Sequence, residues 1–297
     1  MRSPITPQPQ HLLLTLLGDF WYRREEALPS TALVELLAEC GVSNSGARAA
    51  IARLARRGML ELVREGRRTS YRLTAKGSAV LLEGTRRIFA FGTRALPWDG
   101  SWTVVAFSLP EARRDRRHVL RVRLRWLGFA GLYDALWVAP GDHRAAAEAL
   151  LEELAVTTAT VVLGPASGPP GGNPMRAWDP ADLRRHYERF IADFAPLGER
   201  VAAGAVGSVE ALAARTSAID VWRTFPGQDP ELPEPLLPAG WPRRAARDLF
   251  VEIYDTLGPP ATARFREILA AHAPELAPLA EHHSALQGAT LEAAAAV

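Results

Sequence analysis

The sequence predicts a multi-domain α+β protein, and three patterns along its 297 residues carry this prediction. Amphipathic helical segments and a short hairpin occupy the N-terminal part, a β-α-β-α-β order follows, and the remainder is helical. A chain of this length usually forms two or three domains rather than a single core. We therefore expect domains at about residues 10–90, 97–163 and 176–285.

The N-terminal segment has the elements of a winged helix-turn-helix. Apolar residues recur at helical spacing, Pro29–Ser30 and Gly41 mark helix ends, and two strand-like runs flank a charged turn. The expected elements are helices over residues 11–24, 30–40 and 44–57, strands over 59–64 and 69–74, and a closing helix over 75–89. Because this order ends in a two-stranded wing beside the third helix, it predicts a domain that binds DNA.

The pattern changes after Pro97–Gly100. The expected elements are a strand over 102–107, a helix over 111–127, a strand over 132–139, a helix over 142–154 and a strand over 157–163. This order predicts a ferredoxin-like α+β domain with a further strand that the pattern does not reveal. A stretch rich in Gly and Pro at 164–174 then leads to an all-helical C-terminal domain, which we expect to serve dimerisation or effector binding.

Basic charge is concentrated in the N-terminal segment. Residues 1–90 contain 14 Lys and Arg against 8 Asp and Glu, residues 91–163 contain 9 against 8, and residues 164–297 contain 12 against 17. A basic domain on an otherwise neutral or acidic chain indicates that this domain alone has a polyanionic partner.

The third expected helix and the hairpin after it carry the candidate DNA-contacting residues. Arg48 and Arg56 lie on one side of this helix about 12 Å apart, while Ile51 and Leu54 lie on the apolar side. The candidate residues are Asn44, Ser45, Arg48, Arg53, Arg56 and Arg57 on the helix, and Arg64, Arg67 and Arg68 on the hairpin. We expect the first three to approach base edges, the other helical residues to contact phosphates, and the hairpin to reach the adjacent backbone or minor groove.

Each basic segment has a simpler interpretation. Taken alone, the third helix could be a solvated basic face, but the basic hairpin beside it favours DNA binding. A second basic helix runs from Glu111 through Arg125, and its interleaved acidic residues favour a solvated face or a contact between domains. The alternative for this helix is an auxiliary contact with phosphate or with an anionic ligand such as a coenzyme A thioester.

The sequence indicates no catalytic, metal or cofactor site. Cys40 is the only cysteine, and His282 and His283 stand together without matching ligands. Nucleotide-binding, serine-hydrolase and zinc-protease motifs do not occur. No segment approaches the roughly 18 consecutive apolar residues of a membrane span, and the short apolar run at 11–17 makes a poor signal peptide. We expect a cytoplasmic protein that is not an enzyme and does not enter the membrane.

Seven segments, in order along nearly the whole chain, resemble the PaaX family of phenylacetic-acid degradation repressors. They are LLLTLLGDF (12–20), ARAAIARLARRGML (47–60), EGRRTSYRLT (65–74), WDGSW (98–102), LRVRLRWLGFAGLYDALWVAP (120–140), HYERFIADFAPL (186–197) and ARTSAIDVWRTFPGQDPELPEPLLPAGWPRRAARDLF (214–250). The resemblance implies a homodimeric winged-helix regulator, usually a repressor, that binds double-stranded operator DNA. It also implies release from DNA by an acyl-CoA effector of the phenylacetyl-CoA type.

The same resemblance implies that the central domain is similar to a small CRISPR-associated nuclease with a ferredoxin-like fold. Many relatives have an aspartate after the first strand of this domain, where this chain has Ser108. A serine does not supply the carboxylate that a metal-dependent nuclease needs, so we expect the fold without the chemistry. Two alternatives to the leading hypothesis stay open: a regulator of the same fold that responds to another metabolite, and a metal-dependent nuclease built on the central domain.

Overall fold

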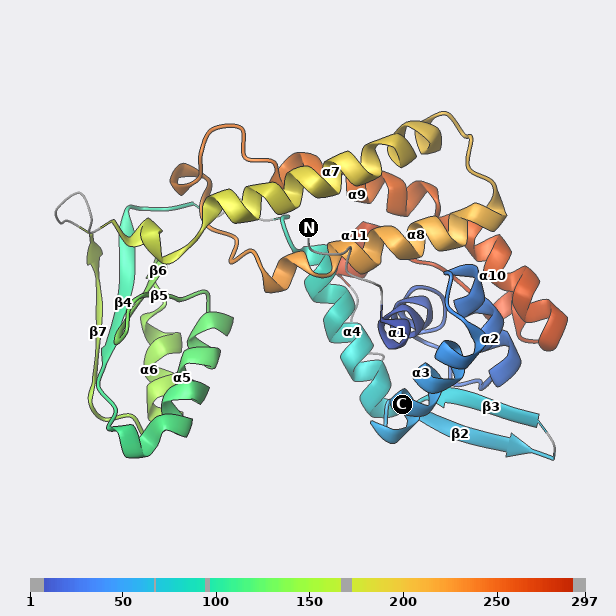
Figure 1. Ribbon diagram of the computed structural model, residues 1–297, viewed down its shortest axis with the longest axis horizontal. Coiled ribbons are helices and arrows are strands. Elements are labelled where there is room, and N and C mark those ends of the chain that lie inside the picture. Colours follow the sequence, from blue (N-terminus) through green and yellow to red (C-terminus); the bar gives the residue numbers. More distant parts are fainter. Residues whose placement is uncertain (1–7, 67, 94–96, 167–172, 291–297) are drawn as a thin grey trace. The chain divides into compact units, whose positions relative to one another are not determined.

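The chain folds into two compact units (Figure 1). The computed structural model describes residues 8–66, 68–93, 97–166 and 173–290. The first unit comprises Met1–Thr93, Glu188–Gly227 and Arg243–Val297, and the second comprises Arg94–Tyr187 and Gln228–Pro242. Residues from both ends of the chain therefore build the first unit.

The N-terminal part of the first unit combines helices with a small antiparallel sheet. Its elements are α1 (Pro9–Phe20), β1 (Leu28–Pro29), α2 (Ser30–Glu39), α3 (Asn44–Arg56), β2 (Leu60–Glu65), β3 (Arg68–Leu73) and α4 (Ala75–Ala90). The sheet order is β1-β3-β2. The helices and the hairpin strands were expected from the sequence, whereas β1 was not, because two residues are too few to show the alternation that identifies a strand.

Two of the boundaries that differ from the prediction have a clear structural cause. α1 ends at Phe20 rather than at Arg24, because the chain turns where the buried Trp21 donates its indole N–H to the carbonyl of Glu26 at 3.0 Å. The hairpin is also tighter than expected, since its register pairs Glu65 with Arg68 and leaves a two-residue turn. Gly66 in that turn has a φ of +61°, a left-handed conformation that glycine adopts without strain.

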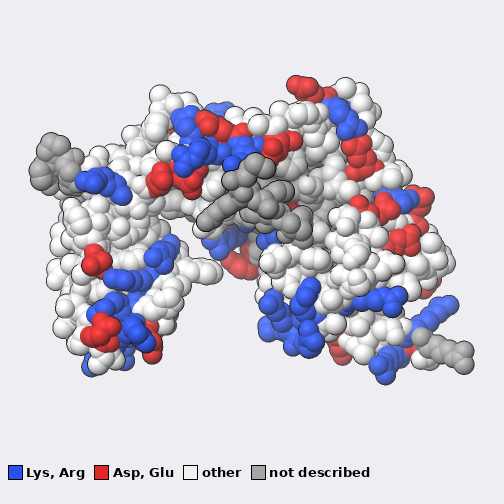
Figure 2. Space-filling view, viewed as in Figure 1, with Lys and Arg blue, Asp and Glu red and all other residues white. Residues whose placement is uncertain are grey.

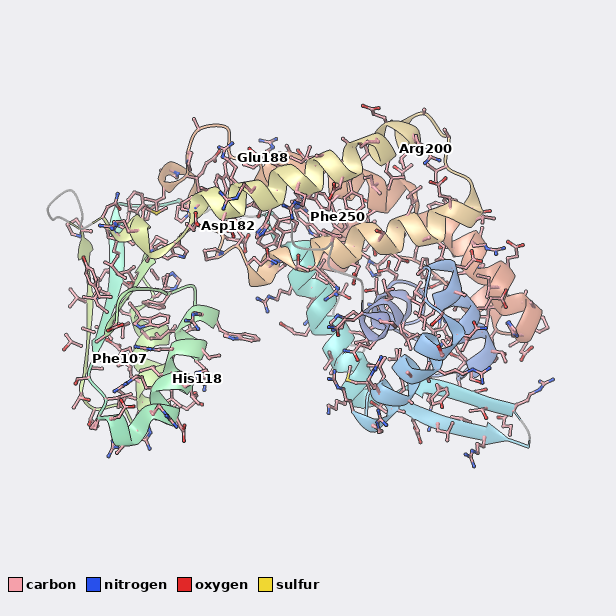
Figure 3. The ribbon with its side chains drawn as sticks, viewed as in Figure 1. Phe107, His118, Asp182, Glu188, Arg200 and Phe250 are labelled. Carbon is pink, nitrogen blue, oxygen red and sulfur yellow. The ribbon has the colours of Figure 1, made fainter. Side chains whose placement is uncertain are left out.

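The C-terminal helices complete the core of the first unit. They are α7 (Pro180–Ala202), which begins in the second unit, α8 (Ser208–Trp222), α9 (Arg243–Thr256), α10 (Gly258–His272) and α11 (Ala285–Ala289), with short 3-10 turns at Phe225–Gly227 and Ala277–Leu279. Aromatic rings join these helices to one another and to the N-terminal ones. Trp222 stacks on Phe250, which Figure 3 labels, with ring centroids 4.9 Å apart, and Phe20 of α1 meets Phe265 of α10 at 5.0 Å.

The second unit is a four-stranded antiparallel sheet with two helices. Its elements are β4 (Ser101–Phe107), a 3-10 turn at Glu111–Arg113, α5 (Arg114–Trp126), β5 (Ala130–Tyr133), β6 (Leu136–Pro140), α6 (Arg144–Glu153), β7 (Ala159–Pro165) and 3-10 turns at Pro174–Ala177 and Glu234–Leu236. The strand order is β5-β6-β4-β7. The single strand expected over 132–139 is therefore wrong: this segment is a hairpin of two strands, which the continuous apolar run concealed. The core includes Phe107 of β4 (Figure 3) and Leu120 and Leu124 of α5.

Within the described ranges, the structure contains no helix with both the length and the apolar character required to cross a bilayer.

A buried polar network connects four segments of the first unit. The Arg215 side chain on α8 is 0% exposed, and its Nε lies 3.4 Å from a carboxylate oxygen of Asp19 on α1. Its terminal nitrogens donate to the carbonyls of Tyr254 on α9 at 2.6 Å and of His283 at 3.0 Å. The Tyr254 hydroxyl donates to the other oxygen of Asp19 at 2.9 Å. Burial raises the pKa of Tyr254 well above its usual range, so this donor stays protonated.

We expect Arg215→Met to destabilise the first unit by about 3–5 kcal/mol, because it leaves the carboxylate of Asp19 buried without its cation. Urea denaturation followed by tryptophan fluorescence measures the free energy of unfolding. The matched control is Arg200→Met near the end of α7 (Figure 3), which removes an exposed ion pair with Glu210. The two charged groups of this pair lie 2.6 Å apart, and the loss in the free energy of unfolding is expected to be much smaller. Equal losses for the two variants would show that the buried network does not stabilise this unit.

Candidate nucleic-acid interface

Helix α3 is built to present one face to the outside. Ser43 caps its N-terminus, where the hydroxyl oxygen accepts a hydrogen bond from the backbone N–H of Gly46 at 3.2 Å. Ala47, Ile51 and Leu54 are buried and hold the helix against α1 and α2. Since the buried residues recur at helical spacing, the positions on the opposite side of the helix face solvent.

All six candidate residues on α3 and its C-terminal end are exposed. They are Asn44, Ser45, Arg48, Arg53, Arg56 and Arg57. The capping residue also contacts one member of this set, since the hydroxyl oxygen of Ser43 lies 3.2 Å from that of Ser45. The side chains at 48, 52 and 56 follow one another along the helix, so a small residue, Ala52, separates the two arginines.

The two described arginines of the hairpin, Arg64 and Arg68, lie on different faces. Successive side chains of a strand alternate between faces, and the register places Arg64 opposite Thr69 and Arg68 opposite Glu65. Arg64 therefore shares a face with Thr69 and Tyr71, whereas Arg68 lies on the other face. Both are exposed, and the third predicted residue, Arg67, lies outside the described residues. Of the two described hairpin arginines, Arg64 therefore lies on the face turned toward α2 and α3, and Arg68 does not.

A groove joins α3 to this face of the hairpin. It has a volume of about 630 Å³ and is lined by Asn44 and Arg48 of α3, Thr69 and Tyr71 of β3, and residues of α2. On α2 the carboxylate of Glu35 also lines the groove, and it lies 2.7 Å from Nε2 of His272. The structure thus brings together two of the residues expected to approach bases and the face of the hairpin that carries Arg64.

The arginines of the two basic helices, α3 and α5, differ in their contacts within the protein. In the described part of the chain, the guanidinium groups of Arg48, Arg53 and Arg56 on α3 have no hydrogen bond or ion pair within the protein. On α5, by contrast, Arg121 donates to the carbonyl of Asp134 at 2.7 Å. Further α5 arginines contact their own unit: Arg116 donates to the carbonyl of Ala155, Arg117 to the carbonyl of Leu109, Arg123 to Glu153, and Arg125 lies over the Trp137 ring. The cations of α3 are therefore available to a partner, whereas most of those on α5 hold the second unit together.

Lys76 is a further basic residue beside α3 that no sequence pattern singles out. It lies at the start of α4, and its Nζ donates to the carbonyl of Arg57 at 2.9 Å, just beyond the end of α3. The side chain is exposed and adds a positive charge beside Arg56 and Arg57. A single lysine after a strand forms no sequence pattern. Its place beside the end of α3 follows only from the fold, because the hairpin brings the start of α4 back to α3. Figure 2 shows Lys and Arg gathered at this edge of the first unit, over α3, the start of α4 and the hairpin.

Other polar residues singled out in the sequence have local partners. Ser108 follows β4, where its N–H donates to the carbonyl of Thr158 at 2.9 Å and its own carbonyl accepts from the Thr158 hydroxyl. His283 belongs to the Arg215 network through its carbonyl, and His282 lies beside it; burial lowers the pKa of both imidazoles. Among the described residues, no three His, Cys, Asp or Glu side chains come together in a group that could hold a metal ion.

Comparison with known proteins now identifies the family. Three family models match consecutive segments: PaaX-like protein over residues 8–77, PaaX protein central Cas2-like domain over 95–173, and PaaX-like protein C-terminal domain over 178–267. A protein of Escherichia coli (strain K12) described as transcriptional repressor PaaX is 30% identical over 262 residues, which cover 85% of this chain and 81% of that protein. The chain belongs to the PaaX family. The resemblance seen in seven sequence segments is thereby confirmed.

A solved structure has a similar fold. Uncharacterized protein Rv0674 from Mycobacterium tuberculosis superposes with a TM-score of 0.56 over 86% of this PaaX-family chain and 98% of its own. Its sequence identity is 20%, so this similarity concerns the fold alone.

In this PaaX-family protein we expect Gly77→Ala to weaken the support of the hairpin. A Cβ at this position would lie 2.2 Å from the carbonyl oxygen of Met59, so α4 and the start of β2 must move apart. The expected loss in the free energy of unfolding is about 1–3 kcal/mol, measured by urea denaturation. The matched control on the same helix is Gly84→Ala, whose Cβ would meet nothing within 4 Å and which should stabilise the helix by roughly 0.5–1 kcal/mol. Finding Gly77→Ala as stable as wild type would disprove this contact.

Proposed function

We propose that the chain is a sequence-specific DNA-binding transcriptional regulator that acts as a repressor. One observation carries the proposal: α3 presents arginines that have no partner among the described residues, beside a groove that it shares with the hairpin. The E. coli relative, described as a transcriptional repressor, supports the same function. Double-stranded operator DNA is the polyanion that fits a basic helix and a basic hairpin.

The proposed fold of the DNA-binding region is a winged helix-turn-helix. α2 and α3 supply the two helices, the short connection over residues 40–43 supplies the turn, and β2 and β3 supply the wing. For the second unit, the order β-α-β-β-α-β with strands arranged β5-β6-β4-β7 supports a ferredoxin-like fold. We retain the division into domains at 10–90, 97–163 and 176–285 as a proposal.

The proposed DNA contacts divide into two groups. Asn44, Ser45 and Arg48 at the N-terminal end of α3 read base edges, because this end of a recognition helix enters the major groove first. The remaining candidates, Arg53, Arg56, Arg57, Arg64, Arg67 and Arg68, contact phosphates or the adjacent groove, and Lys76 joins them.

The proposed regulation involves a homodimer and a small effector. Two recognition helices must match half-sites about 34 Å apart, which a dimer provides. An effector that binds one conformation more tightly shifts the dimer away from this spacing. We propose an aryl-CoA of the phenylacetyl-CoA type as the effector and genes for aromatic-acid breakdown as the target. In this proposal the second unit has no catalytic role, since Ser108 offers no carboxylate after β4.

We expect Arg48→Ala and Arg64→Ala to weaken DNA binding in different ways. Arg48→Ala should cost roughly 1–3 kcal/mol on the preferred duplex and relax the preference at one base pair. Arg64→Ala should weaken binding to all duplexes alike and reduce the salt slope by about 1, and Arg67→Ala should do the same. Fluorescence anisotropy with duplexes selected from a random pool measures both effects at several salt concentrations.

The control for these variants is Arg114→Ala, which removes an equal charge from the exposed start of α5 in the second unit. It should leave DNA binding unchanged. If the α3 and hairpin variants bind every duplex as wild type does, the interface lies elsewhere.

We expect phenylacetyl-CoA to release the protein from its selected duplex, whereas coenzyme A alone should not. Anisotropy of the labelled duplex during titration measures this release. A protein that binds DNA but is released by no aryl-CoA would disprove the effector class and leave a regulator of the same fold that responds to another metabolite.

A further inference from the structure

A cleft opens within the first unit between α1, α4 and the end of α8. It has a volume of about 320 Å³. One side of α1 contributes Leu14 and Thr15, one side of α4 contributes Val80 and Ile88, and α8 contributes Ile219. The lining is mostly apolar and incompletely covered, since Val80 is 48% exposed. Half-exposed aliphatic side chains in a concave site are typical of places where a ligand binds.

Small residues keep this cleft open. Gly84 lies on the cleft side of α4, and a Cβ there would meet no atom within 4 Å. Gly18 faces it from α1, where a Cβ would be 3.5 Å from Leu81, an ordinary contact. Both glycines occur inside helices, where glycine is unfavourable relative to alanine, and neither has a positive φ that would require it. The role of Gly18 and Gly84 is therefore to leave the cleft free of side chains.

Cationic groups border the apolar surface. Arg87, Arg223 and His11 line the cleft, and so does Asp19, whose carboxylate is paired with Arg215. Arg87 donates to the carbonyl of Pro226 at 2.7 Å, and Arg223 donates to Asp220 at 2.7 Å and lies 3.0 Å from Nδ1 of His11. These contacts hold the guanidinium groups of Arg87 and Arg223 at the border of the cleft. An occupant that matches this site has an apolar body and an anionic or carbonyl group beside it.

The volume limits the size of the occupant. A cavity of about 150 Å³ holds benzene, and ligand sites range from about 300 to 1,000 Å³. The cleft therefore accommodates an aryl-acyl group. The nucleotide of a coenzyme A thioester does not fit beside it and would have to extend over the exposed side of Arg87. A free aryl acid and its coenzyme A thioester share this acyl group.

The cleft also borders the elements that hold the candidate DNA-binding surface. α1 packs against α3, and α4 follows β3 directly and packs against both β3 and α1. An occupant between α1 and α4 therefore acts on the two supports of α3 and of the hairpin.

We infer that the cleft between α1, α4 and α8 is the effector site and binds an aryl-acyl group, with Arg87 and Arg223 beside its carboxylate or thioester. This inference rests on the proposed function for its link to DNA, but the binding itself can be measured without DNA. Occupation changes the spacing of α1 and α4, and with it the placement of α3 relative to the hairpin.

The test uses the full chain in isothermal titration calorimetry with phenylacetate, phenylacetyl-CoA and coenzyme A as probes. At least one of the two acyl compounds should bind, and coenzyme A alone should bind weakly or not at all. Gly84→Leu fills the cleft and should weaken acyl binding roughly 10-fold or more, since the added side chain occupies the site. Glu83→Leu, one residue earlier and exposed on the same helix, adds a leucine outside the cleft and should bind as wild type does.

The thermal midpoint of Gly84→Leu should equal or exceed that of wild type, because a helical glycine is replaced where there is room. If this variant does not fold, Val80→Trp blocks the cleft from its exposed side and serves the same purpose. Comparable binding of either acyl compound to wild type and to a folded blocked variant would overturn the inference, as would the absence of acyl binding to wild type.

The same variants separate this inference from the proposed function. Gly84→Leu should bind the selected duplex but resist release by the acyl compound that releases wild type. If wild type binds no duplex, the proposed function fails, and calorimetry still decides whether the cleft binds an acyl group.

Discussion

The buried ion pair between Arg215 and Asp19 is the constraint on which the first unit depends. A guanidinium and a carboxylate removed from water are tolerated only when hydrogen bonds satisfy them, and here the partners come from several segments distant in sequence. Asp19 is near the end of α1, Arg215 is on α8, and the carbonyls of Tyr254 and His283 complete the site. The network therefore fixes α1 relative to the C-terminal helices, and α1 in turn packs against the helix that carries the candidate DNA contacts.

The same arrangement explains how one helix can be both firmly held and widely exposed. α3 buries Ala47, Ile51 and Leu54, so its opposite side is free to carry charge. The hairpin is kept near it because Gly77 allows α4 to approach the carbonyl of Met59, a contact that any side chain at this position would prevent. A rigid support of this kind suits a surface that must match the spacing of a groove.

The partners of an arginine tell more about whether it can bind DNA than its position in the sequence does. α5 has as strong a basic pattern as α3, yet most of its guanidinium groups donate to carbonyls or carboxylates of its own unit. A charge already paired inside the protein gains little from a phosphate, because the existing interaction must first be lost. The arginines of α3, which have no partner in the described part of the chain, carry no such cost, and this is why α3 rather than α5 is the candidate interface.

The sequence by itself determined the helices and the hairpin of the N-terminal region, the family, and the exposed arginines of α3, because amphipathic periodicity and turn residues are local signals. The sequence did not reveal β1, and it predicted a single strand where the structure has β5 and β6. Very short strands and continuous apolar runs show no alternation of polar and apolar residues. Only the tertiary structure decided that Arg64 and Arg68 lie on opposite faces, that Lys76 lies beside the end of α3, and that His283 belongs to a buried network. These facts depend on register and on contacts between residues far apart in the chain, which no local pattern encodes.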